Sequence, residues 1–225
     1  MVYLAVLAGI LIIGGLGLTS VITKNMAPSA KRLAMEQQRL KEDMDQWAGQ
    51  LVPINKEELE LFSWGQEKQV LRRGITTTAK GIYTTIYHEP VLAYSYREYI
   101  GKPEKRNALL YARTSEHDFV YWIRKGIGTL FIDGQEVGTL SREGVLRGKR
   151  TGKAIAERAS VDQQAMMPVT VGNREVGSLS IPEQNQKKGL HDRAFNFLKP
   201  DLNDKEEQLF LALALEALVK EVVKE

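Results

Sequence analysis

The sequence contains no cysteine among its 225 residues. This absence excludes disulfide scaffolds, thiolate metal sites, iron–sulfur clusters and cysteine nucleophiles. The chain also lacks a marked excess of charge, because 31 basic residues face 28 acidic ones and the net charge is +3. So balanced a charge gives no electrostatic indication of nucleic acid, and we expect none as a partner.

Recognisable catalytic and nucleotide-binding motifs are absent from the sequence as well. Residues 148–154 have only three residues between their glycines and no hydroxyl after Lys153, so they do not form a phosphate-binding loop. No serine stands in a GxSxG elbow, and His88, His117 and His191 lack metal-ligand spacing. Each histidine adjoins an acidic residue, so an enzyme remains one interpretation of the chain, beside the two non-enzymatic ones given below; it would act at the surface of a membrane. We expect no catalytic residues, no metal site and no cofactor.

One long hydrophobic run is present, at residues 2–22, and it carries no charge over 21 residues. As a helix rising about 1.5 Å per residue it spans about 30 Å, the thickness of a bilayer core. A cleaved signal peptide would need a basic start and a shorter apolar core. Residues 1–23 are therefore predicted to form a transmembrane anchor.

The flanks of this run predict its orientation in the membrane. No basic side chain precedes it, whereas five follow within twenty residues: Lys24, Lys31, Arg32, Arg39 and Lys41. Because basic residues stay on the cytoplasmic side, we expect an integral protein of the plasma or inner membrane. Its N-terminus would lie outside and the bulk of the chain on the cytoplasmic side.

Residues 24–53 are predicted to form a juxtamembrane helical stalk, which Pro53 ends. Its positions at alternating spacings of four and three are Leu33, Gln37, Leu40, Met44, Trp47 and Leu51. This spacing is typical of a short coiled coil, through which the chain would form a homo-oligomer. It is equally typical of an amphipathic helix lying on the membrane or on the following domain, and the sequence leaves both interpretations open.

Residues 54–225 are predicted to form one mainly β domain. Ten candidate strands between residues 69 and 181 are separated by Gly, Pro and Asp residues, which favour turns. Asp133-Gly134 is a strong hairpin signal. Residues 131–141 and 170–180 are similar to each other, with five identities in eleven positions at an offset of 39. We interpret them as a repeated hairpin in which Gly138 and Gly177 mark bulges or close packing.

The C-terminal segment predicts a helix over residues 204–223. Asn203 and Glu206 fit a capping box, and the run from Leu209 to Leu215 covers every face of a helical wheel. A helix that is apolar all round must be buried on all sides, and this one is too short to cross a bilayer. We therefore expect a closed antiparallel β-barrel around a buried hydrophobic C-terminal helix, with a re-entrant membrane helix as the alternative.

The hairpins at residues 136–141 and 175–180, with the segment 193–200 that leads into the apolar helix, resemble the tubby-like superfamily. This superfamily includes tubby C-terminal domains, phospholipid scramblases and plant LURP-one-related proteins. The resemblance covers residues 68–223 and implies a closed barrel of about twelve strands around one central helix. It also implies recognition of anionic lipid headgroups without catalysis. Because the anchor is N-terminal and no DxDxDG-type loop is present, it does not imply lipid scrambling or calcium dependence.

One group of basic residues is the candidate binding site for lipid headgroups or other anions. Its six members fall within 17 residues: Arg142, Arg147, Lys149, Arg150, Lys153 and Arg158. Basic side chains near an anionic leaflet strengthen membrane binding, and a tethered domain needs only a weak patch. The structural alternative is a solvated loop.

These patterns predict a non-enzymatic single-pass membrane protein whose barrel binds anionic lipid headgroups or a partner. The alternative is a membrane-tethered structural or adaptor protein that oligomerises through its stalk and uses the barrel to dock proteins. The two differ in where charge changes act, because the first depends on the basic group and the second on the apolar positions of the stalk.

Overall fold

A computed structural model describes residues 19, 21–101, 105–161, 166–180 and 193–224. Within these ranges, no helix is both long enough and apolar enough to cross a membrane. The predicted anchor, residues 1–23, falls almost entirely outside the described residues.

Twelve antiparallel strands form one sheet in which each strand pairs with its neighbours in the chain. They are β1 (Phe62–Arg73), β2 (Thr77–Thr85), β3 (Pro90–Tyr99), β4 (Asn107–Arg113), β5 (Asp118–Arg124), β6 (Ile127–Ile132), β7 (Gln135–Leu140), β8 (Val145–Gly148), β9 (Ala154–Arg158), β10 (Met166–Val171), β11 (Arg174–Ser180) and β12 (Phe195–Leu198). A bridge between Ser63 and Arg193 and a bond from Ala194 N to Phe62 O (2.8 Å) join the two ends of the sheet. The predicted antiparallel barrel is thus confirmed as a nearly closed one.

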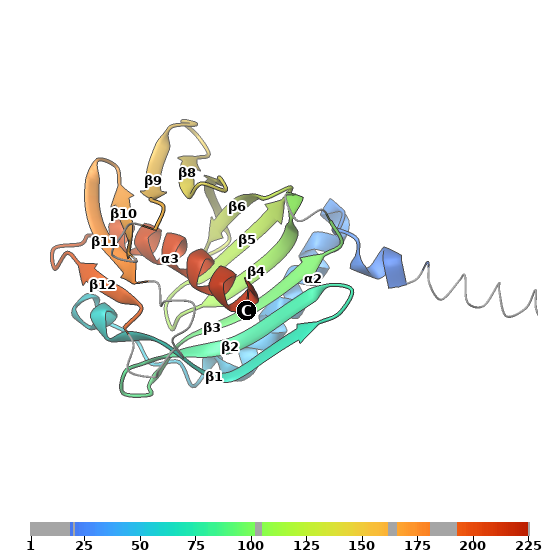
Figure 1. Ribbon diagram of the computed structural model, residues 1–225, viewed down its shortest axis with the longest axis horizontal. Helices are drawn as coiled ribbons and strands as arrows, with labels where there is room; N and C mark the ends of the chain where they lie inside the picture. Colours follow the sequence, from blue (N-terminus) through green and yellow to red (C-terminus); the bar gives the residue numbers. More distant parts are fainter. Residues whose placement is uncertain (1–18, 20, 102–104, 162–165, 181–192, 225) are drawn as a thin grey trace, which may run out of the picture.

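The helix α3 (Asp204–Lys224) runs through the middle of the curved sheet (Figure 1). Its predicted capping box is formed, since Glu206 N donates to Asn203 Oδ1 and Asn203 N donates to Glu206 Oε2, both at 3.0 Å. Every residue from Leu209 to Val219 is buried. The barrel interior therefore supplies the enclosure that an all-round apolar helix requires.

Because neighbouring strands are antiparallel, successive turns lie at opposite ends of the barrel. The mouth end carries the β1–β2, β3–β4, β5–β6 and β7–β8 turns and the C-terminal end of α3, where Arg73 Nη2 donates to Val223 O (3.2 Å). The far end carries the β2–β3, β4–β5 and β6–β7 turns and the N-terminal end of α3.

The predicted stalk lies on the barrel. Helix α2 (Ala30–Ala48) packs across the outer face of β3 and β4, on the side of the sheet opposite α3 (Figure 1). Leu40, Met44, Trp47 and Leu51 are buried there with sheet residues such as Leu109. The amphipathic positions are thus covered by the sheet, as expected for a helix lying on the domain. A coiled coil would require α2 to leave this surface.

Three ion pairs flank this apolar contact and fix α2 along its length. Glu36 pairs with Arg97 (3.0 Å), Asp43 with Lys80 (2.8 Å) and Asp45 with Arg113 (2.6 Å). Glu36 is itself buried, and it also accepts a hydrogen bond from the Tyr99 hydroxyl (3.3 Å). Apolar burial and paired charges together hold the helix in one register.

The sequence prediction was wrong at three places in the sheet. Strand β1 begins at Phe62 rather than at residue 69, directly after a short 3-10 helix, Lys56–Leu61. Strands β8 and β12 were not predicted. Each has only four residues, and β8 lies in a charged segment, so neither shows the alternation that marks a strand.

The repeated hairpins form β6–β7 and β10–β11, each with a register shift next to the glycine that both copies share. A Cβ atom at Gly138 would lie 1.9 Å from Arg147 O, and one at Gly177 would lie 2.7 Å from Phe197 O. Both contacts are with backbone atoms, which cannot move aside as a flexible side chain can. The interpretation of these glycines as points of close packing is confirmed.

We expect Gly138→Ala and Gly177→Ala each to reduce the free energy of unfolding by about 1–3 kcal/mol, because the added methyl group overpacks the strands. Thermal unfolding followed by circular dichroism measures the effect. Gly49→Ala is the matched control, since a Cβ atom at Gly49 would have nothing within 4 Å and the φ of this residue is −73°. Equal melting temperatures for all three variants would contradict the prediction.

Candidate functional site at the mouth of the barrel

The structure divides the six predicted site residues between two locations. Arg147, Lys149, Arg150 and Lys153 are exposed on the β8–β9 hairpin, whose tip points towards the far end. Lys149 pairs there with Glu136 (2.7 Å). Arg142, in the β7–β8 turn, and Arg158, at the end of β9, lie together at the mouth end and line one cavity.

Arg158 reaches inward from β9 and joins the barrel to the central helix. Its Nη1 donates to Glu216 Oε2 at 3.0 Å and to Leu213 O at 2.6 Å. Lys220, one helical turn further along α3, pairs with the other oxygen of Glu216. The side chains of Arg158 and Glu216 are only 7% and 5% exposed, so this pair is enclosed by protein.

The charges of this group explain how a carboxylate is tolerated inside an apolar barrel. Burial acts to raise the pKa of Glu216, but Arg158 and Lys220 outweigh it and hold that pKa below its ordinary value. Glu216 is therefore ionised at neutral pH. Two cations and one anion leave this buried group with one positive charge, which faces the mouth.

A cavity of about 420 Å³ opens at the mouth end beside this group. Its apolar lining comes from Ile123, Leu140, Met167 and Ala217. Its charged side chains are Arg106, Arg142, Arg158, Lys220 and Lys224, against Glu216 and Glu221, so five positive and two negative charges give a net +3. The volume lies within the range of about 300–1,000 Å³ found for small-molecule sites. An apolar interior with a cationic entrance is suited to an anion that carries an apolar part.

Arg142 is the cation of this entrance with fewest partners. Its Nη2 donates to Lys125 O (2.6 Å), and within the part of the chain that the structure describes it makes no ion pair. The side chain lies across Gly126, where a Cβ atom would be 2.2 Å from Arg142 Nε and where φ is +81°. The positive φ favours glycine at this position, and the exposed guanidinium group of Arg142 lies over it.

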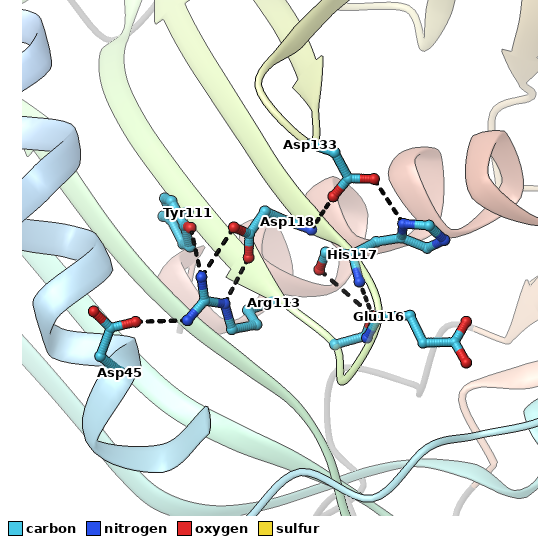
Figure 2. A network of polar contacts seen from close by, with 8 residues as sticks. Asp45, Tyr111, Arg113, Glu116, His117, Asp118 and Asp133 are labelled. Atoms are coloured by element: carbon cyan, nitrogen blue, oxygen red, sulfur yellow. Dashed lines mark hydrogen bonds and ion pairs between the residues drawn. The ribbon is translucent and has the colours of Figure 1, made fainter. Parts of the chain in front are cut away.

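A second polar cluster joins α2 to the barrel, as Figure 2 shows. Arg113 donates to both oxygens of Asp118 (2.6 and 2.9 Å), to Asp45 of α2 (2.6 Å) and to the Tyr111 hydroxyl (3.2 Å). Burial acts to raise the pKa of Asp118, yet the hydrogen bonds from Arg113 and Tyr111 hold it below its ordinary value. Each of the three nitrogen atoms of this arginine donates to a protein oxygen, and the bond to Asp45 positions α2.

His117 lies in the same region and contacts the N-terminal turns of α3, at the far end of the barrel. Its Nδ1 lies 2.7 Å from Asp133 Oδ2 (Figure 2), and its Nε2 lies 3.1 Å from the Gln208 side-chain amide. The imidazole thus links the β4–β5 and β6–β7 turns to the first turns of α3. Among the described residues, no group of three or more histidine, aspartate or glutamate side chains could hold a metal ion. His191 lies outside the described residues.

Sequence reasoning missed Glu216 and Lys220 as members of the mouth. The predicted apolar run stops at Leu215, whereas burial continues beyond it to Val223. A lone carboxylate within an otherwise apolar helix is the signal that could have identified it, because a buried charge requires a partner. Its partner Arg158 is 58 residues away in the chain, and only the fold brings the two together.

We expect Glu216→Gln to lower the melting temperature by about 10 °C, because it leaves the Arg158 charge buried without its counter-ion. The double variant Arg158→Met, Glu216→Leu replaces both charges with apolar groups and should melt close to the wild type. Thermal unfolding monitored by tryptophan fluorescence compares them. A double variant as unstable as Glu216→Gln would show that the ion pair is not the cause.

The lowered pKa of Asp118 predicts how stability depends on pH. A carboxyl group whose folded pKa lies below its unfolded value stabilises the fold above the unfolded pKa, about 4, and loses this contribution as pH falls through the folded pKa. The difference in unfolding free energy between wild type and Asp118→Asn should therefore be largest at pH 7 and shrink below about pH 4. Chemical unfolding at a series of pH values measures it, and a difference independent of pH would contradict the assignment.

Comparison with models of protein families, with curated protein sequences and with solved structures gives no match to this chain. The function is therefore argued from the residues of the mouth.

Proposed function

We propose that this protein is a non-enzymatic, single-pass membrane protein whose barrel binds an anionic lipid headgroup in the cationic mouth. The cavity that Arg142, Arg158 and Lys220 share is the observation that carries the proposal. The transmembrane anchor at residues 1–23, with the barrel on the cytoplasmic side, is part of the proposal and rests on the apolar run and its basic flank.

The charges of the mouth support an anion over a neutral ligand. Arg142 is exposed and makes no ion pair among the described residues, whereas Lys220 shares Glu216 with Arg158. The phosphate group of a lipid could accept charge-assisted hydrogen bonds from Arg142 and Lys220 while the acyl chains lie against Ile123, Leu140 and Met167. An anionic phospholipid combines these two chemistries in one molecule.

Kinship with the tubby-like superfamily remains a second part of the proposal. The architecture that the resemblance implies, strands closed around one C-terminal helix, agrees with the fold. The adaptor alternative receives less support, because the apolar positions that would join two stalks are buried against the sheet.

The experiment uses the full chain in phosphatidylcholine nanodiscs and three soluble probes. Dihexanoyl phosphatidic acid presents the anion with acyl chains, inorganic phosphate presents the anion alone, and dihexanoyl phosphatidylcholine presents the chains without net charge. We expect calorimetric titration to show the tightest binding for the first. Arg142→Ala should weaken this binding about tenfold, the loss expected for one charge-assisted hydrogen bond.

Arg150→Ala is the matched control, because Arg150 is an equally exposed arginine on the β8–β9 hairpin, outside the cavity. It should bind the phosphatidic acid as the wild type does. Equal weakening by both variants would move the site to the hairpin. Binding of inorganic phosphate as tight as that of the lipid would indicate an anion site without lipid specificity.

A further inference from the structure

Four large apolar side chains are exposed at the mouth end of the barrel. Ile75 is 65% exposed, Met26 54%, Ile127 53% and Ile100 38%. They stand in or beside the β1–β2, β3–β4 and β5–β6 turns and in the segment that precedes α2. Turns ordinarily favour Gly, Pro, Asn, Asp and Ser, so turn chemistry does not explain Ile75 in the β1–β2 turn. Ile100 and Ile127 stand where the β3–β4 and β5–β6 turns join their strands.

Backbone and side-chain contacts hold these residues on one surface. Met26 forms a bridge with Ile100, whose N–H donates to Asn25 O at 2.7 Å. The Thr76 hydroxyl, next to Ile75, donates to Asn25 Oδ1 at 3.3 Å. Gly126, next to Ile127, donates its N–H to Arg106 O at 2.8 Å. These contacts join the loops and the segment that carry the four apolar residues.

Basic side chains stand in these loops, in the β7–β8 turn and in the segment before α2. They are Lys24, Arg73, Lys105, Arg106, Lys125 and Arg142, of which Arg106 and Arg142 line the cavity. The far end carries both signs of charge. Its turns and the first turn of α3 hold the acidic residues Glu89, Glu116, Asp133, Asp204, Glu206 and Glu207, and the β8–β9 hairpin brings the basic residues Arg147, Lys149, Arg150 and Lys153. What distinguishes the mouth end is that exposed isoleucines stand beside its basic side chains.

The chain enters the barrel at this same end. Val21 and Ile22 are the last residues of the apolar run, and they precede the Asn25 and Met26 contacts by only a few positions. A run that spans a bilayer would leave the membrane beside Ile75 and Ile100. Exposed isoleucines interspersed with lysine and arginine match the composition of surfaces that enter the interfacial region of anionic bilayers.

We infer that the mouth end is a membrane-docking surface, on which Ile75, Ile100 and Ile127 enter the interface of an anionic bilayer and the basic side chains contact its headgroups. The barrel then lies mouth-down, with the cavity open to the leaflet. This orientation goes beyond the proposed binding of a headgroup and does not require that the cavity be occupied.

The absence of cysteine makes a direct test available, since one introduced cysteine is then the only labelling site. Ile75→Cys and Ile127→Cys in the full chain are labelled with an environment-sensitive nitrobenzoxadiazole dye. The labelled chain is placed in vesicles of phosphatidylcholine with 30% phosphatidylserine, which is roughly the composition of an anionic leaflet. We expect blue-shifted emission from both sites and quenching by nitroxide lipids.

Tyr87→Cys is the matched control, because Tyr87 is 67% exposed, as Ile75 is, but lies in the β2–β3 turn at the far end. Its label should emit as in water and escape quenching. Quenching at the mouth end should weaken in pure phosphatidylcholine or at high salt. The inference is overturned if the Ile75 and Ile127 labels behave as the Tyr87 label does, or if the chain does not associate with the vesicles. The inference rests on the proposed anchor, so a chain that does not associate with vesicles would overturn both. Labels that all behave alike would overturn the orientation only, because the soluble short-chain lipid tests the headgroup site separately.

Discussion

The fold depends on one constraint, which is that α3 is apolar on every face and cannot be exposed to water. Thirteen of its residues are buried, and the barrel is the enclosure that buries them. A sheet of twelve strands leaves an interior wide enough for a helix, and the near-closure between β1 and the segment before β12 removes exposed strand edges. The helix and the barrel thus depend on each other, since each covers apolar side chains of the other that would otherwise be exposed to water.

The polar groups inside the barrel follow from the same constraint. The Tyr121 hydroxyl donates to Ala212 O (2.5 Å), and Arg158 donates to Leu213 O, so two strands bind the backbone of the helix at adjacent residues. Glu216 then completes the group from the helix side. Such directional contacts specify the rotation and height of α3, which apolar packing alone leaves less well defined. The buried charge beside the cavity is consequently a product of how the helix is held.

Much of this architecture could be predicted from the sequence because its signals are local. The capping box at Asn203, the all-round apolar run and the hairpin glycines each act through neighbours in the chain or through close packing at one point. Strand β8 could not be predicted, because four residues in a charged segment are held by pairing with β7 and β9 rather than by their own pattern. The candidate site was predicted only in part. Proximity in the sequence grouped Arg150 with Arg158, whereas the antiparallel turns send the first to the far end and the second into the barrel.

The position of α3 after all twelve strands in the chain has a consequence for biosynthesis. As the ribosome extends the polypeptide, every strand emerges before the helix that fills the barrel. The inner face of the sheet, with side chains such as Tyr121 and Leu130, has no partner until α3 is released. During this interval the nascent chain exposes apolar strands that favour aggregation. We therefore expect its folding to depend on chaperones, although the native structure buries these strands. Release of the helix is thus the event that commits the polypeptide to its native state.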